Sequence, residues 1–276
     1  MKTTIKIHET AFVTATYRAS NAELSKDRYS NYWKNPKTDK WIENYVKKVS
    51  MDEPFVHCLR NRFFYETIRA LIEKQQIEVL INFGCGFSMY PYLFDEKLIN
   101  IEIDQKVLID FKKEQVEKWI QEGKLPPRKI HYLSMDFNLQ QTELEREIKT
   151  IVKEKTSFVL LEGVLFFLSK ESTNELVDLI GRIQNKDSYF GCVSFLDKIR
   201  DTDCFQRLVK FCEDELVANN EFECLTLPTS YYQKIADYQL IEHEDYVSLS
   251  KKYSPENKIE NGDLILNENM YLLKRK

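Results

Sequence analysis

The chain has 276 residues, of which 43% are hydrophobic and 30% charged, as expected for a globular protein with a substantial core. Its formal net charge of −4, without a basic stripe, argues against nucleic acid as the main partner. The six cysteines form no Cys-x-x-Cys pair and only four histidines occur, so no metal site is expected.

The sequence also bears on the compartment. Residues 1–9 contain no apolar segment of the kind found in signal peptides. The longest apolar stretch, 158–168, contains Glu162 and is too short to cross a bilayer. Together with cysteines in apolar surroundings, these features predict a reducing, cytoplasmic setting and no membrane association.

Residues 1–75 are predicted to form helices without strands. The apolar residues of 41–49 fall on one helical face, and a second helix is expected over 57–74. Pro36 and Pro54 are expected to separate these helices. We therefore expect two parts, a helical lid on the substrate side (1–75) and a cofactor-binding domain (76–276).

From residue 77 onward, apolar stretches of strand length alternate with helical patterns. The expected strands cover 79–83, 98–103, 130–133, 158–161 and 189–196, and the expected helices between them cover 107–120, 144–152 and 172–183. This alternation predicts an α/β fold, a parallel sheet with helices on both faces. Two later strands, 240–246 and 271–274, are expected to pair antiparallel at the sheet edge.

A glycine-containing turn follows the first predicted strand. Gly84 and Gly86 flank Cys85, and the chain has only seven glycines in all. Such a turn allows the backbone to approach a ligand at the carboxyl end of a strand, where open α/β sheets bind ligands. The motif alone is weak, because a tight turn without any ligand explains it equally well.

The next three strands end in acidic residues. Asp104, about 20 residues after the glycines, is placed to accept hydrogen bonds from a ribose. Asp136 and Phe137 suit the edge and the face of an adenine. Glu162 ends the fourth strand and suits a cationic group, because a buried carboxylate needs a partner. The alternatives are helix caps or loop residues for the aspartates, and for Glu162 a pair with an arginine of the N-terminal helices.

Both NAD and S-adenosylmethionine are compatible with this pattern. A dinucleotide fingerprint would place a third glycine at position 89, where this chain has Met89. The methyl donor has no phosphate and does not require that glycine. The sequence therefore favours S-adenosylmethionine.

Four segments resemble the leucine carboxyl methyltransferase family, which includes carboxyl O-methyltransferases of the tetracenomycin type. Residues 10–19 resemble its N-terminal Thr-Ala…Arg-Ala signature, and 60–64 resemble its arginine-led helix. Residues 82–87 with 102–104 are similar to its LGAG and EVD segments, and 158–168 to EGVLxYL. The resemblance implies the class I methyltransferase fold, Rossmann-like, with a seven-stranded, mostly parallel sheet whose last strand is reversed.

The resemblance also implies roles in binding S-adenosylmethionine and its product S-adenosylhomocysteine. Arg60, joined by Arg18, would bind the carboxylate of the donor, and Gly84 with Gly86 would line its methionine part. Asp104 would bind the ribose of the donor, and Glu162 its amino group. Asp136 and Phe137 would bind the adenine.

The acceptor is less well defined by the sequence. A small-molecule or peptide carboxylate is expected from the resemblance, but Ser88, Met89 and Phe167 depart from the family pattern on the acceptor side. No residue is assigned as a general base, because a carboxylate acceptor is already ionised at pH 7. The alternatives are a phenolic or enolic hydroxyl acceptor, a non-catalytic protein that binds S-adenosylmethionine, and an NAD-dependent enzyme.

Overall fold

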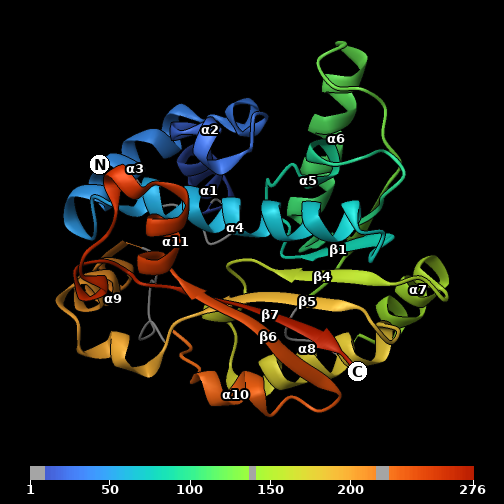
Figure 1. Ribbon diagram of the computed structural model, residues 1–276. Coiled ribbons are helices and arrows are strands. Elements are labelled where there is room, and N and C mark those ends of the chain that lie inside the picture. The colour runs from blue at the N-terminus through green and yellow to red at the C-terminus, as the bar shows by residue number, and fades with distance from the viewer. Residues whose placement is uncertain (1–9, 137–140, 216–223) are drawn as a thin grey trace.

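Helices surround a seven-stranded sheet in the computed structural model, which describes residues 10–136, 141–215 and 224–276 (Figure 1). The strand order is β3-β2-β1-β4-β5-β7-β6. Strands β1 to β5 pair in parallel, whereas β7 is antiparallel to both β5 and β6. The strands are β1 (Val79–Phe83), β2 (Ile99–Asp104), β3 (Ile130–Ser134), β4 (Ser157–Leu161), β5 (Tyr189–Ser194), β6 (Tyr238–Asp245) and β7 (Asn269–Arg275). The predicted class I methyltransferase topology is confirmed.

Helices precede the sheet and connect its strands. The N-terminal ones are α1 (Thr10–Ser20), α2 (Ala22–Ser25), α3 (Pro36–Lys48) and α4 (Glu53–Glu73). The others are α5 (Tyr90–Leu93), α6 (Lys106–Gln121), α7 (Thr142–Val152), α8 (Lys170–Ile183), α9 (Asp203–Glu215), α10 (Thr229–Gln233) and α11 (Tyr246–Tyr253). Short 3-10 turns lie at Ser30–Trp33, Leu165–Phe167, Asp197–Asp201, Pro255–Asn257 and Gly262–Leu264.

The expectation that Pro36 and Pro54 separate the N-terminal helices is wrong. Pro36 is the first residue of α3, and Pro54 lies in the first turn of α4. Proline fits there because the first N–H groups of a helix have no partner within the helix. Helix α4 consequently begins four residues earlier than the expected His57 and runs for 21 residues.

The central strands β1, β4 and β5 are buried on both faces, and their consecutive side chains point to opposite faces, toward different helices. Leu80, Phe158 and Leu160 pack with α1, α3, α4, α9 and α11 in one hydrophobic cluster. Val79 and Ile81, also of β1, pack with α7, α8 and α10 in a second cluster. Figure 1 shows the two sets of helices on opposite sides of the sheet. The N-terminal helices thus share a core with the strands that carry the predicted site.

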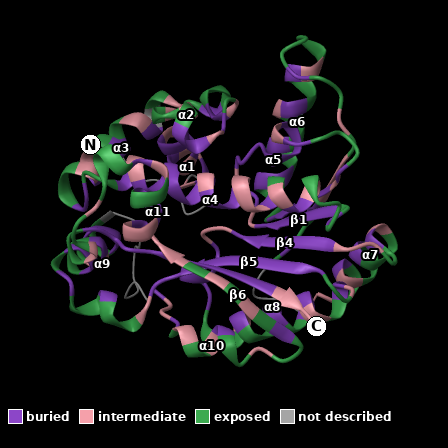
Figure 2. Cartoon of the chain, viewed as in Figure 1, coloured by how far each residue is buried: buried purple, intermediate pink, exposed green. Residues whose placement is uncertain are grey.

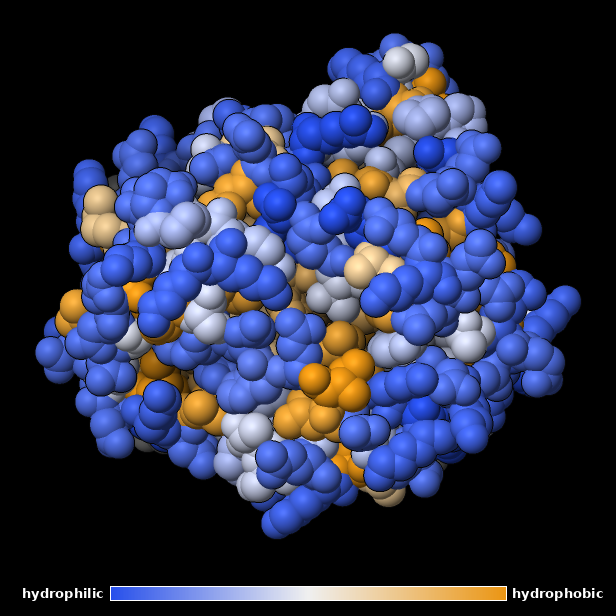
Figure 3. All heavy atoms as spheres, viewed as in Figure 1, coloured by the Kyte–Doolittle hydropathy of each residue, from blue (hydrophilic) through white to orange (hydrophobic). Residues whose placement is uncertain are grey.

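The burial pattern follows this layering. Figure 2 shows β1, β4 and β5 buried, and exposed residues on the outer sides of the helices. Figure 3 shows a mostly hydrophilic face with a small group of hydrophobic side chains over β6 and β7. Within the described ranges, none of the helices combines the length and the apolar character that a membrane span requires.

Candidate functional site

The predicted site residues gather where the strand order reverses. Strand β1 lies between β2 and β4, and the register pairs Phe83 with Ile103 on one side and with Leu161 on the other. The carboxyl ends of these three parallel strands therefore lie next to one another. This topological switch point is where open α/β sheets bind their ligands.

The glycine turn after β1 requires its glycines. Gly84 has a φ of 63° and Gly86 a φ of 44°, values that other residues adopt only with strain. A Cβ atom added to Gly84 would stand 2.2 Å from Cγ2 of Val164, which follows β4. A Cβ atom on Gly86 would stand 3.4 Å from Cβ of Ala11 in α1. The turn is thus enclosed between the end of β4 and the first helix.

Asp104 links the glycine turn to the end of β2. The side chain is buried, and its Oδ2 accepts the Gly86 N–H at 2.8 Å while Oδ1 accepts the Gln105 N–H at 2.7 Å. Burial raises the pKa of Asp104, although these two backbone hydrogen bonds oppose the rise. Asp104 does not cap α6, because its bonds go to residues outside that helix. Each carboxylate oxygen still has a lone pair for a ligand hydroxyl.

Arg60 of α4 and Glu162 at the end of β4 form a buried ion pair. Arg60 Nε donates to Glu162 Oε1 at 3.0 Å, and the two side chains are only 4% and 8% exposed. The hydroxyl of Tyr90 donates to the other oxygen, Oε2, at 2.9 Å. Glu162 is therefore paired with an arginine of the N-terminal helices, which was the alternative interpretation of this residue. Arg60 is buried, so this is not a surface ion pair.

Arg18 lies on α1 and has a different partner. Its Nε donates to Asp27 Oδ2 at 3.0 Å, and both side chains are buried. Its Nη2 is also buried and hydrogen-bonds to no described residue. A buried guanidinium N–H without an acceptor is costly, which marks Nη2 as a donor available to a ligand.

The end of β3 adjoins the same edge of the sheet. The N–H of Met135 donates to the carbonyl oxygen of Asp104 at 2.9 Å, which brings the exposed Asp136 next to the end of β2. Phe137, the second residue expected at the adenine, lies outside the described residues.

Comparison with known protein families assigns the chain to one of them. The family described as Leucine carboxyl methyltransferase matches residues 10–181, which is more than half of the chain. The chain belongs to this family. It is a methyltransferase that uses S-adenosylmethionine, and this sets aside the NAD-dependent and non-catalytic alternatives. A search of curated proteins found no match.

Solved structures support the fold of this methyltransferase. A protein from Thermobifida fusca, assigned as a methyltransferase, has a TM-score of 0.62 at 12% identity, covering 96% of this chain and 94% of its own. A DUF574 family protein from Streptomyces avermitilis has a TM-score of 0.63 at 8% identity, covering 96% and 97%. Magnesium protoporphyrin IX methyltransferase from Synechocystis, solved with S-adenosylhomocysteine, has a TM-score of 0.50 at 11% identity, covering 89% and 97%.

The residues of this methyltransferase at the strand ends suit S-adenosylmethionine chemically. Asp104 retains acceptor capacity for hydroxyls, and the buried Nη2 of Arg18 has no partner among the described residues. Arg60 uses Nε and Nη1 for hydrogen bonds, so that its Nη2 has no described acceptor. Carboxylates for the ribose and ammonium groups and guanidinium N–H groups for a carboxylate match the polar groups of the donor.

Three residues of this network were not identified from the sequence. Glu268, just before β7, accepts Arg60 Nη1 with Oε1 at 3.0 Å and Oε2 at 2.8 Å. Tyr246 donates to Glu268 Oε2 at 2.5 Å, and Tyr90 donates to Glu162. Glu268 lies 208 residues from Arg60, so no local pattern connects the two. The available signal is the polar triplet 267–269, which leads into the apolar part of a strand.

Two further ionisable groups of α4 lie on the side of Arg60. Glu53 and His57 precede it by seven and three residues and are buried, and Glu53 Oε1 and His57 Nδ1 hydrogen-bond to no described residue. Burial, together with the charge of Glu268, raises the pKa of Glu53 to about 8, although Arg60 opposes the rise. Burial, then the charges of Arg60 and Arg18, lower the pKa of His57. Burial therefore favours the neutral form of both side chains.

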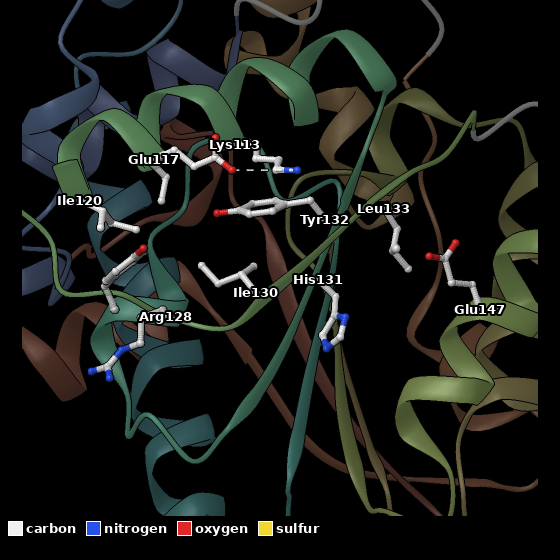
Figure 4. A pocket seen from close by; sticks show the side chains of 11 residues that line it. Lys113, Glu117, Ile120, Arg128, Ile130, His131, Tyr132, Leu133 and Glu147 are labelled. Atoms are coloured by element: carbon white, nitrogen blue, oxygen red, sulfur yellow. Dashed lines mark ion pairs between the residues drawn. The ribbon is translucent and has the colours of Figure 1, made fainter.

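A separate cavity follows the outer edge of β3 (Figure 4). It has a volume of about 350 Å³ and is bounded by α6, the edge strand and Glu147 of α7. In Figure 4, Tyr132 and His131 point to different sides of the strand, as alternation requires. None of the described residues predicted for the donor site lines this cavity.

Proposed function

We propose that this methyltransferase holds S-adenosylmethionine at the ends of β1, β2, β3 and β4 and methylates the carboxylate of a small molecule or of a peptide C-terminus. Asp104 binds the ribose hydroxyls, and Asp136 with Phe137 binds the adenine. Arg60 Nη2 and Arg18 Nη2 bind the carboxylate of the donor, and Glu162 binds its ammonium group. Gly84 and Gly86 line the methionine part.

The charge around Arg60 carries this proposal. One guanidinium is buried with two carboxylates, those of Glu162 and Glu268, which leaves one net negative charge at the end of β4. Uncompensated buried charge is costly. S-adenosylmethionine has a sulfonium, an ammonium and a carboxylate, and thus a net positive charge that offsets this excess.

A carboxylate acceptor agrees with the family description and with simple chemistry. The bound donor supplies a methyl group on an already activated sulfonium. A carboxylate is ionised at pH 7 and attacks without losing a proton, so no general base is required. The residues of the chain then have to align the two reactants and exclude water, and such positioning accounts for a large part of the rate. Helix α1 over the glycine turn suits that task.

The stability in mild base of the bond between the transferred methyl group and its acceptor tests the acceptor class. The purified enzyme is incubated with S-adenosylmethionine radiolabelled in its methyl group and with a panel of aliphatic acids, aromatic acids, peptides and phenols. A methyl ester releases volatile labelled methanol in mild base, whereas an aryl methyl ether retains its label. We expect base-labile product from at least one carboxylate. Label only in base-stable product would contradict the carboxylate proposal.

A hydroxyl acceptor is the second candidate, and His57 is the observation that favours it. A phenol or enol must lose its proton during transfer, which requires a general base. Burial lowers the pKa of His57, and its Nδ1, 4.0 Å from Glu53 Oε2, hydrogen-bonds to no described residue. In the same assay, His57→Gln would abolish transfer to a hydroxyl but leave transfer to a carboxylate largely intact.

The proposed compartment is the cytoplasm. All six cysteines are free and buried, and burial raises the pKa of the thiols of Cys58 and Cys204 to about 11. Thiols with a raised pKa react slowly. Mass spectrometry of protein purified without reductant, after alkylation in denaturant, should find six alkylated cysteines, and disulfide-linked peptides would contradict this proposal.

A further inference from the structure

The guanidinium of Arg60 is held by two carboxylates that are far apart in the sequence. Glu162 binds its Nε at the end of β4, and Glu268 binds its Nη1 through both carboxylate oxygens. Glu268 is itself fixed by the hydroxyl of Tyr246, the first residue of α11. Tyr246 is fully buried. The backbone N–H of Tyr246 donates to Asn267 Oδ1 at 3.0 Å, so α11 and the segment before β7 are joined twice.

These contacts leave a single nitrogen of Arg60 for another partner. Nη2 has no hydrogen bond to a described residue, and it lies 3.6 Å from the position of a Cβ atom on Gly163. Because the guanidinium is planar and rigid, fixing Nε and Nη1 also fixes the direction of Nη2. That nitrogen is thus held beside the turn that follows β4.

Without Glu268, Arg60 would be expected to pair with Glu162 in a different geometry. Arginine and carboxylate commonly pair through two parallel N–H···O bonds, and Nε with Nη2 would offer this fork to Glu162. Such a pair would use the nitrogen that is otherwise available, and would also occupy the Glu162 oxygen that accepts from Tyr90. Glu268 draws Nη1 to the other side and so disfavours the fork.

We infer that Glu268 and Tyr246 are positioning residues that keep Arg60 Nη2 directed at the carboxylate of the methyl donor. This inference rests on the donor site proposed above. Glu268 and Tyr246 lie outside residues 10–181, the segment matched by the family. The β7 end of the sheet thereby controls affinity for the amino-acid part of the donor, while the adenosine part depends on other residues.

Binding measurements with two ligands distinguish the positioning role of Glu268 and Tyr246 from a general effect on the fold. S-adenosylhomocysteine contains the amino-acid part, whereas 5′-methylthioadenosine shares the adenosine part and lacks the amino acid. Titration calorimetry would measure both with the wild type, Glu268→Gln and Tyr246→Phe. The matched control is Tyr238→Phe, which removes a buried hydroxyl bound to Gln184 at 2.6 Å in another part of the sheet.

We expect Glu268→Gln to weaken binding of S-adenosylhomocysteine about tenfold, and Tyr246→Phe about threefold, while 5′-methylthioadenosine binding changes less than twofold. Tyr238→Phe should leave both affinities unchanged. An equal loss for both ligands in Glu268→Gln, or no loss for either, would overturn the positioning role. If Glu268→Gln does not fold, Tyr246→Phe decides by the same criterion, since it keeps the buried charge pair.

The variant Arg60→Met distinguishes this inference from the donor site on which it depends. If Arg60→Met loses its preference for S-adenosylhomocysteine but Glu268→Gln keeps it, only the positioning role is wrong. If Arg60→Met also keeps that preference, the assignment of Arg60 to the carboxylate of the donor is wrong.

Discussion

Replacing Glu162 by alanine is expected to weaken binding of S-adenosylhomocysteine at least tenfold, or by about 1.4 kcal/mol. The substitution removes the proposed acceptor for the ammonium group, leaves the Nε of Arg60 without its acceptor and leaves the hydroxyl of Tyr90 with Asn61 alone. Arg60 keeps Glu268, so we expect the protein to fold with reduced stability. Titration calorimetry measures the affinity, and urea unfolding the stability.

A matched control for this substitution is available on α7. Glu145 also accepts from two cationic side chains, Lys149 and Arg182, but it lies at the surface of the far side of the sheet. Glu145→Ala should leave the affinity unchanged, because surface ion pairs contribute little. An unchanged affinity in Glu162→Ala as well would exclude Glu162 from the donor site.

Replacing Gly84 by alanine is expected to have the largest effect on stability. The added Cβ atom would overlap Cγ2 of Val164 at 2.2 Å, and a φ of 63° is itself strained for alanine. Together these effects should lower the free energy of unfolding by roughly 3 kcal/mol. Relief of the overlap requires the turn and the end of β4 to separate, so the affinity for S-adenosylhomocysteine should fall too. Urea unfolding and calorimetry measure the two effects.

Gly181 provides the control for the glycine substitution. It lies within α8, where an added Cβ atom has no neighbouring atom within 4 Å. Gly181→Ala should raise the free energy of unfolding by about 1 kcal/mol, because alanine favours the helix over glycine. Equal destabilisation by both substitutions would contradict the geometric explanation for Gly84.

Hydrophobic patterns were sufficient to predict the α/β class and the parallel strands of the sheet. Each strand from β1 to β5 is a short apolar segment between helical patterns, so its existence could be inferred without tertiary information. The predicted ends of helices and strands were less accurate. A break at Pro54 predicts that helix α4 begins at His57, whereas this proline occupies the first helical turn. Pairing of β7 between β5 and β6 depends on contacts distant in sequence.

The site was only partly accessible from the sequence. Asp104 and Glu162 follow directly from their positions at strand ends, since parallel strands bring these ends together. For Glu162, a pair with an arginine of the N-terminal helices is only one of two alternatives, because local sequence does not define which helix lies over β4. Glu268 could not be identified, because its contact with Arg60 depends on where the segment before β7 lies relative to α4. The buried pair of Glu102 with Lys112 likewise depends on how α6 lies on β2.

A crystal structure with S-adenosylhomocysteine bound tests the central claim most directly. We predict the ribose hydroxyls within hydrogen-bond distance of Asp104, the amino group at Glu162 and the carboxylate at Nη2 of Arg60. The product bound elsewhere, for example in the cavity along β3, would contradict the proposed site. So would a product bound at the strand ends with its amino-acid part turned away from Arg60 and Glu162.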